Sequence, residues 1–213
     1  METKLLALTP LIVLFAVFLA AFIVTKLRKE TGDYVSQELP GFCFHDSLDE
    51  KLTENIIDFI ELRGKTGDVG GKNLKSQLIA DITGKEIEQI ESDDFNFHVP
   101  FAYRPFDTIL CLEVLEHLQN PLFFLKELAE SLAPEGTIYL STPHRPRILW
   151  TTHHFFEFGP EHLTKWIFTP AGLKVGRHKY LRSNHPTYFY VTGIRPFLRL
   201  FFNYTVIYEL KKI

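Results

Sequence analysis

One stretch, residues 106–146, constrains the fold of this 213-residue chain more than any other. It contains two apolar runs of strand length, residues 106–112 and 137–142. Between these runs, Asn120 is a favourable helix N-cap and Pro121 suits the first helical position. An apolar stripe at helical spacing follows, made of Leu122, Leu125, Leu128, Ala129 and Leu132. Two such strands joined by an amphipathic helix predict a parallel βαβ unit with a right-handed crossover.

The loops after these two strands are the expected ligand site, because open parallel sheets bind ligands at the carboxyl ends of their strands. The run FDTILCLEVLEHLQNP, residues 106–121, resembles the fourth-strand region of class I methyltransferases that use S-adenosylmethionine. The resemblance implies an α/β, Rossmann-like, mostly parallel seven-stranded sheet flanked by helices, with Leu112 and Glu113 in the cofactor site. A polar loop in some other α/β protein is the alternative interpretation of residues 113–117, which periodicity alone does not exclude.

Composition narrows the class of protein. The formal net charge is −3, so nothing indicates a nucleic-acid-binding surface. With 46% hydrophobic residues the chain has enough apolar surface for one α/β domain. Its two cysteines, Cys43 and Cys111, lie far apart in the sequence, and Cys111 falls on an expected buried strand. A disulfide framework is therefore not predicted, and a reducing compartment is the simpler interpretation.

The N-terminal part contains a long apolar segment, residues 5–24, without a charged residue. As a helix it would span about 30 Å, the thickness of a bilayer core, so it predicts a transmembrane helix. The basic residues Lys26, Arg28 and Lys29 follow it and only Lys4 precedes it. The positive-inside rule then places the rest of the chain in the cytoplasm, as a single-pass membrane protein. A buried core helix is the alternative.

These features divide the chain into a membrane anchor (1–30), a linker (31–45) and a methyltransferase-like domain (46–213). Ser47 and Glu50 form a capping box that predicts a helix at the start of this domain. The segment 173–181 predicts a strand, and 204–210 predicts a closing antiparallel strand. Between these two, the aromatic segment 187–202 would cover the acceptor site, lie on the membrane surface or pack in the core.

A glycine-containing turn at Asp68, Val69, Gly70 and Gly71 resembles the family's cofactor loop. Glycines permit positive φ and a close backbone approach to a ligand, and a nearby carboxylate favours the amino-acid end of S-adenosylmethionine. The sequence departs from the family pattern because the full G-x-G-x-G motif is absent and residues 65–67 are not large and apolar.

Two further acidic residues are carried over from the resemblance. Asp81 lies in a short apolar run, residues 78–82, that predicts the second strand, so it is the expected ligand of the ribose hydroxyls. Asp94 opens the run DFNFHVPF, which resembles a family motif whose acidic residue lies near the adenine. A solvated acidic turn is the alternative interpretation of Asp94.

The acceptor side is the least specific part of the sequence. His153 and His154 are candidate general bases for an oxygen acceptor, and loop packing is their alternative role. The histidines and Glu157 nearby do not form an H-E-x-x-H motif and no cysteine accompanies them, so no metal site is predicted.

The chain is thus expected to be a membrane-anchored methyltransferase with S-adenosylmethionine as cofactor and a small-molecule or lipid-linked acceptor. The alternative is a catalytically inactive methyltransferase-like module that binds or scaffolds at the membrane.

Overall fold

The computed structural model describes residues 46–70, 74–99, 105–150, 154–182 and 204–213, together with Leu19, Leu198, Phe201 and Phe202. The chain divides into two units, Met1–Phe44 with Asn184–Phe202, and His45–Ser183 with Asn203–Ile213. Nearly all described residues belong to the second unit, which carries the fold discussed below.

A mixed sheet of six strands forms the centre of this unit, in the order β2-β1-β3-β4-β6-β5. The neighbouring pairs among the first four strands are parallel, and β6 runs antiparallel to both β4 and β5. The described residues therefore contain six strands where seven were expected. The strands are β1 (Thr66–Val69), β2 (Ile87–Ile90), β3 (Phe106–Leu112), β4 (Leu132–His144), β5 (Leu173–Arg182) and β6 (Tyr204–Lys212).

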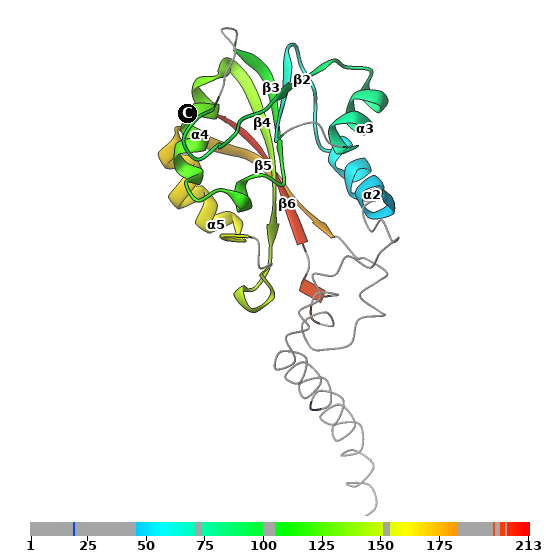
Figure 1. Cartoon of the computed structure of the whole chain (residues 1–213), viewed down its shortest axis with the longest axis vertical. Coiled ribbons are helices and arrows are strands. Elements are labelled where there is room, and N and C mark those ends of the chain that lie inside the picture. Colours follow the sequence, from blue (N-terminus) through cyan, green and yellow to red (C-terminus); the bar gives the residue numbers. More distant parts are fainter. Residues whose placement is uncertain are drawn as a thin grey trace, which may run out of the picture. The chain divides into compact units, whose positions relative to one another are not determined.

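Helices cover both faces of the sheet, as expected for a Rossmann-like fold (Figure 1). On one side lie α2 (Asp46–Ile57) and α3 (Leu74–Thr83), and on the other lie α4 (Pro121–Glu130) and α5 (Pro160–Leu163). Four short helical turns complete the unit: η1 (Leu115–His117), η2 (Arg147–Leu149), η3 (Thr164–Phe168) and η4 (Thr169–Ala171).

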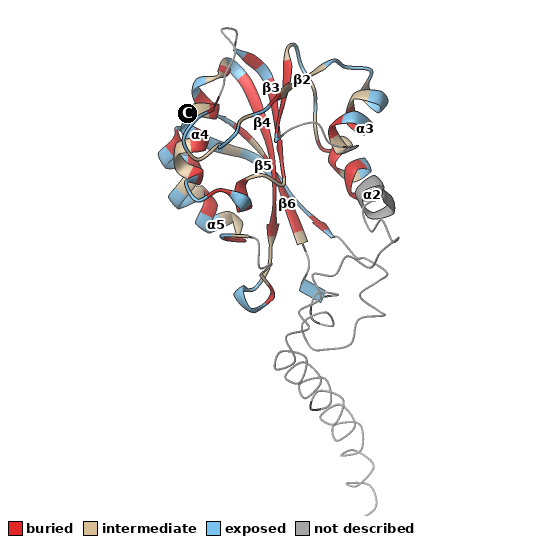
Figure 2. Ribbon diagram, viewed as in Figure 1, coloured by how far each residue is buried: buried red, intermediate tan, exposed pale blue. Residues whose placement is uncertain are grey.

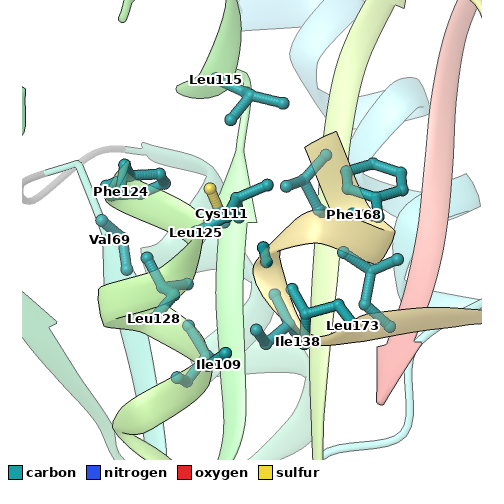
Figure 3. Close-up of a cluster of buried hydrophobic side chains, with 14 of the residues drawn as sticks. Val69, Ile109, Cys111, Leu115, Phe124, Leu125, Leu128, Ile138, Phe168 and Leu173 are labelled. Carbon is teal, nitrogen blue, oxygen red and sulfur yellow. The ribbon is translucent and has the colours of Figure 1, made fainter. Parts of the chain in front are cut away.

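Two hydrophobic cores result, because successive strand residues point to opposite faces. On β3, Ile109 and Cys111 pack on the α4 side, whereas Leu110 and Leu112 pack on the α2 side. Figure 2 shows buried residues running along the central strands, and Figure 3 shows the α4-side cluster between sheet, α4 and η3. The cysteine on β3, Cys111, is buried and free.

The predicted βαβ unit is confirmed, but its second strand, predicted at residues 137–142, is longer at both ends and extends from Leu132 to His144. β3 has the expected limits, and Asn120 caps α4 by accepting a hydrogen bond from the Phe123 N–H. Strand β4, however, begins at Leu132, which the periodicity had assigned to the helix. Leu132 pairs with Phe106 across the sheet, so its apolar side chain joins the same core from a strand.

The predicted second strand at residues 78–82 is wrong, because these residues lie within helix α3. Gly84 ends the helix with a positive φ of 62°, and its N–H donates to the Ala80 carbonyl. The second strand is instead β2, directly after this helix end. Helix α3 is therefore the crossover helix between β1 and β2.

The predicted transmembrane segment, residues 5–24, lies outside the described residues except for Leu19, which is helical. Across the residues with a described structure, no helix combines the length and apolar character that crossing a bilayer requires.

Candidate functional site

The carboxyl ends of the parallel strands lie at one edge of the sheet, and the site is built there. Gly70 follows β1 with a φ of 119°, a conformation that other residues rarely adopt. A Cβ atom at Gly70 would lie 2.9 Å from Cγ2 of Val114, which follows β3. The glycine therefore allows the turn after β1 to approach the loop after β3 closely.

Glu113, the first residue after β3, has a φ of 58° and is the one non-glycine residue with positive φ in the described chain. Its N–H donates to the carbonyl of Ser141 on β4 at 3.0 Å and lies 3.1 Å from the Ser141 hydroxyl. The same hydroxyl donates to Glu113 Oε1 at 3.0 Å. Such strained conformations concentrate at ligand sites, and here hydrogen bonds to β4 hold the strain in place.

Asp68 occupies a different position from the one expected, because it lies within β1 and not in the turn that follows it. The carboxylate is buried and accepts a hydrogen bond from the Ser76 hydroxyl of α3. Asp68 therefore connects β1 to the helix that follows the glycine turn, and Gly70 is the described residue of the turn itself. Gly71 lies outside the described residues.

Glu116, on the turn η1, is a buried carboxyl group at the same edge of the sheet. Its Oε2 accepts a hydrogen bond from the Thr142 hydroxyl of β4 at 3.1 Å. Burial, followed by repulsion from the nearby Glu113 carboxylate, raises the pKa of Glu116 well above its usual range. The sequence motif contains this glutamate, but nothing in the sequence indicated that its side chain would be buried.

His154 comes from the loop after β4 and lies against η1. Its ring is 4.7 Å from the ring of His117, and the two rings are nearly perpendicular. Its Nδ1 lies 2.7 Å from Oε1 of the buried Glu157, whose Oε2 is 2.9 Å from the guanidinium of Arg145. The Phe155 N–H also donates to the Glu116 carbonyl at 2.8 Å, so this loop is fixed to η1. His153, the other candidate base, lies outside the described residues.

Asp81 and Asp94 are the two other acidic residues that were predicted to bind the cofactor. Asp81 is exposed on α3, so it lacks the strand-end position on which its ribose-binding role was based. The acidic residue directly after β2 is Glu91, which is exposed. Gly84 was the sequence signal for this position of β2. A glycine is common where a helix ends, so the apolar residues after Gly84 belong to the next element.

Asp94 is exposed in the loop after β2, where its Oδ1 accepts hydrogen bonds from the backbone and side-chain amides of Asn96, both at 2.8 Å. Asn96 in turn accepts from the backbone N–H groups of Gln119 and Asn120, which precede α4. Asp94 thus orders the loop that contacts the start of α4. Whether it also lies near an adenine ring stays a prediction.

The strand ends therefore provide a glycine turn that a ligand can approach closely. They also provide hydrogen-bond-accepting carboxylates at Glu91 and Glu113, and a buried carboxyl group at Glu116. Acceptor groups at the ends of neighbouring parallel strands suit a ligand with hydroxyl and ammonium donors. Leu112, at the end of β3, contributes an apolar surface on the α2 side.

Comparison with known proteins adds an independent observation. A family model described as a methyltransferase domain matches residues 43–183. The ubiquinone biosynthesis O-methyltransferase of Aliivibrio fischeri is 26% identical over 159 residues, which cover 74% of this chain and 63% of that protein. The protein of the same name from Xanthomonas campestris pv. campestris is 32% identical over 81 residues, 30% of this chain. The match spans 34% of the length of the Xanthomonas protein.

Solved structures agree with the fold. Mitomycin 7-O-methyltransferase MmcR superimposes with a TM-score of 0.56 over 78% of this chain and 55% of that chain, at 13% sequence identity. At this identity the likeness concerns the fold alone.

Proposed function

Because this chain belongs to the methyltransferase-domain family, we propose that it is a membrane-anchored enzyme that transfers a methyl group from S-adenosylmethionine to a small-molecule or lipid-type acceptor. The observation that carries the proposal is the family match over residues 43–183. The matched segment includes Gly70, Glu91 and Glu113, which directly follow strands β1, β2 and β3. Family membership supports S-adenosylmethionine as the cofactor.

In this proposal the strand ends form the cofactor seat. Gly70 lets the backbone approach the ligand, and the Glu91 carboxylate accepts hydrogen bonds from the two ribose hydroxyls. Glu113 lies at the end of β3, where its carboxylate accepts from the donor groups of the cofactor. Asp68 stabilises this arrangement by joining β1 to α3 through its hydrogen bond with Ser76, and it does not need to contact the ligand.

The reaction requires little covalent help from the protein. A nucleophilic atom of the acceptor attacks the methyl carbon in line with the sulfonium, the carbon–sulfur bond breaks, and S-adenosylhomocysteine leaves. Positioning the acceptor supplies much of the rate in such a step. His154 lies beside η1 at the acceptor side, and Glu157 holds its Nδ1. A role of His154 as general base therefore remains compatible with the geometry.

The amino-acid sequence, rather than the site geometry, supports the proposed membrane location and the proposed class of methyl acceptor. The apolar segment 5–24 supports a membrane anchor with the catalytic domain on the cytoplasmic side. A tethered enzyme reaches acceptors that are dissolved in or bound to the membrane, which favours a lipid-type molecule. Two of the relatives named above are O-methyltransferases of ubiquinone biosynthesis, and this favours an oxygen atom as the methylated position.

A second function, a catalytically inactive binding module at the membrane, is favoured by one observation. The carboxylate of Asp68, expected to face the cofactor, is buried and bonded to Ser76. If the remaining groups are too few to bind S-adenosylmethionine productively, the domain would serve as a scaffold.

The test is a transfer assay with the full chain in detergent, S-adenosylmethionine labelled in its methyl group, and a total lipid extract as acceptor. The proposal predicts label in the organic phase that depends on the protein and is reduced by Glu113→Ala. Label that stays entirely in the cofactor, with both lipid and aqueous metabolite extracts as acceptors, would favour the scaffold function.

A further inference from the structure

Three side chains at the acceptor side form a set of metal-ligand atoms. One ligand atom each from Glu116, His117 and His154 lies within 4.8 Å of the other two. An ion with bonds of about 2.1 Å holds its ligand atoms no more than about 4.2 Å apart, so a small adjustment would close the set. His117 is exposed at the end of η1, and His154 is half-buried beside it.

The buried carboxyl group of Glu116 supplies an independent observation. Its side chain is 0% exposed, and within the described residues its Oε1 has no hydrogen-bond partner. Its Oε2 is already engaged by Thr142. A buried polar atom without a partner is costly, and the neighbouring Glu113 carboxylate adds repulsion. A cation bound at Oε1 would remove both unfavourable contributions.

The second ring nitrogen of His154 is held as it is in known metal sites. Metal-ligating histidines commonly donate their other ring N–H to a carboxylate, which fixes the tautomer and the ring orientation. Here Nδ1 of His154 lies 2.7 Å from Oε1 of Glu157, which leaves Nε2 available as a ligand. Glu157 is itself buried and paired with Arg145 at 2.9 Å. This ion pair holds the Glu157 carboxylate in place, and the carboxylate in turn fixes the orientation of the His154 ring.

We propose that Glu116, His117 and His154 bind one divalent transition-metal ion at the acceptor side of the site, with Glu157 as the residue that positions His154. Two imidazoles and one carboxylate suit Zn²⁺ and similar ions, whereas Mg²⁺ prefers oxygen ligands and water. No metal site was predicted from the sequence, because these residues come from η1 and from the loop after β4 and lack a recognised spacing.

A three-residue set leaves a coordination position open, and this deepens the proposed function on which it rests. An acceptor hydroxyl bound at that position would lose its proton to solvent more readily, since a metal ion lowers the pKa of a bound hydroxyl. In the metal-bound site His154 is a ligand in place of a general base. The resulting oxyanion would form the carbon–oxygen bond as the carbon–sulfur bond of the cofactor breaks. The proposal therefore assigns an oxygen acceptor, a hydroxyl-bearing molecule, to this site.

The experiment is a titration of the untagged full chain, treated with a chelator, with Co²⁺, followed by the visible absorption of the bound ion. We expect one Co²⁺ per chain, displaced by Zn²⁺ but not by an equal concentration of Mg²⁺. Glu116→Gln and His154→Ala should abolish saturable binding, and Glu157→Gln should weaken it about 10- to 100-fold. His162→Ala is the matched control, because His162 lies in the same segment, is exposed and stacks on Phe158.

Titration with S-adenosylhomocysteine and circular dichroism establish that each variant is folded. Should a buried variant fail to fold, His117→Ala replaces an exposed side chain and keeps the test valid. Co²⁺ affinity unchanged in His117→Ala and His154→Ala, or equal displacement by Zn²⁺ and Mg²⁺, would overturn the metal site. If the unmodified chain does not bind S-adenosylhomocysteine, the proposed function is contradicted instead. Failure of the metal site and failure of the proposed function are therefore distinguishable.

Discussion

Asp81 and Glu91 are two acidic residues that the fold places in different surroundings, one on a helix and one directly after β2. We predict that Glu91→Ala weakens S-adenosylhomocysteine binding at least about tenfold, because each lost hydrogen bond to a charged group costs roughly 1.5–3 kcal/mol. Asp81→Ala should leave the affinity unchanged and serves as the matched control. Calorimetric titration measures both, and a larger loss in Asp81→Ala would contradict the position assigned to Glu91.

Other residue roles differ in how far the sequence could reveal them. Asn120 and Pro121 were predictable, because capping and the first helical position depend on the local chain. The bond between the Phe155 N–H and the Glu116 carbonyl was not, because it depends on how the loop after β4 folds back onto η1. Residues of this kind carry a recognisable chemistry but no local signal of their partners.

At the scale of elements, one hydroxyl joins β3 to the segment that leads into β1. The Arg63 N–H donates to the Thr108 hydroxyl at 2.9 Å, and that hydroxyl donates to the Arg63 carbonyl at 2.9 Å. Thr108 is fully buried. We predict that Thr108→Val lowers the free energy of unfolding by about 1–3 kcal/mol, because two backbone groups lose their partner.

Urea denaturation of the purified chain measures this difference. Thr108→Ser keeps the hydroxyl and should recover most of the loss. If Thr108→Val and Thr108→Ser are equally destabilised, packing of the methyl group rather than the hydrogen bonds would account for the effect.

The elements themselves show why part of the fold was predictable. Strand β3 was correct because its residues are apolar on both faces and bounded by clear signals. Strand β1 was not recognised, since Thr66 and Gly67 have low apolar character. A Cβ at Gly67 would lie 2.7 Å from Ile90 Cδ1 and 2.8 Å from Phe106 Cε1, so its absence lets three strands pack closely. Tertiary packing between neighbours therefore overrides the local preference of this segment.

At the scale of the whole molecule, the apolar segment 5–24 should hold the chain in the membrane. We predict that the full chain stays with membranes after alkaline extraction, and that the double variant Leu14→Arg with Phe18→Arg is released. Each arginine at the centre of a spanning helix costs about 2.5–3.5 kcal/mol on insertion. The matched control is Thr31→Arg with Gln37→Arg, which adds the same charge outside the segment. Release of both double variants, or of the unmodified chain, would contradict membrane anchoring.

The central claim is that the ends of β1, β2 and β3 bind S-adenosylmethionine, and calorimetric titration of the full chain with S-adenosylhomocysteine tests it most directly. Glu113→Ala and Glu91→Ala accompany the unmodified chain, and circular dichroism verifies the fold of each. We predict saturable one-to-one binding that both variants weaken. A folded chain that gives no binding signal, or variants with unchanged affinity, would contradict it.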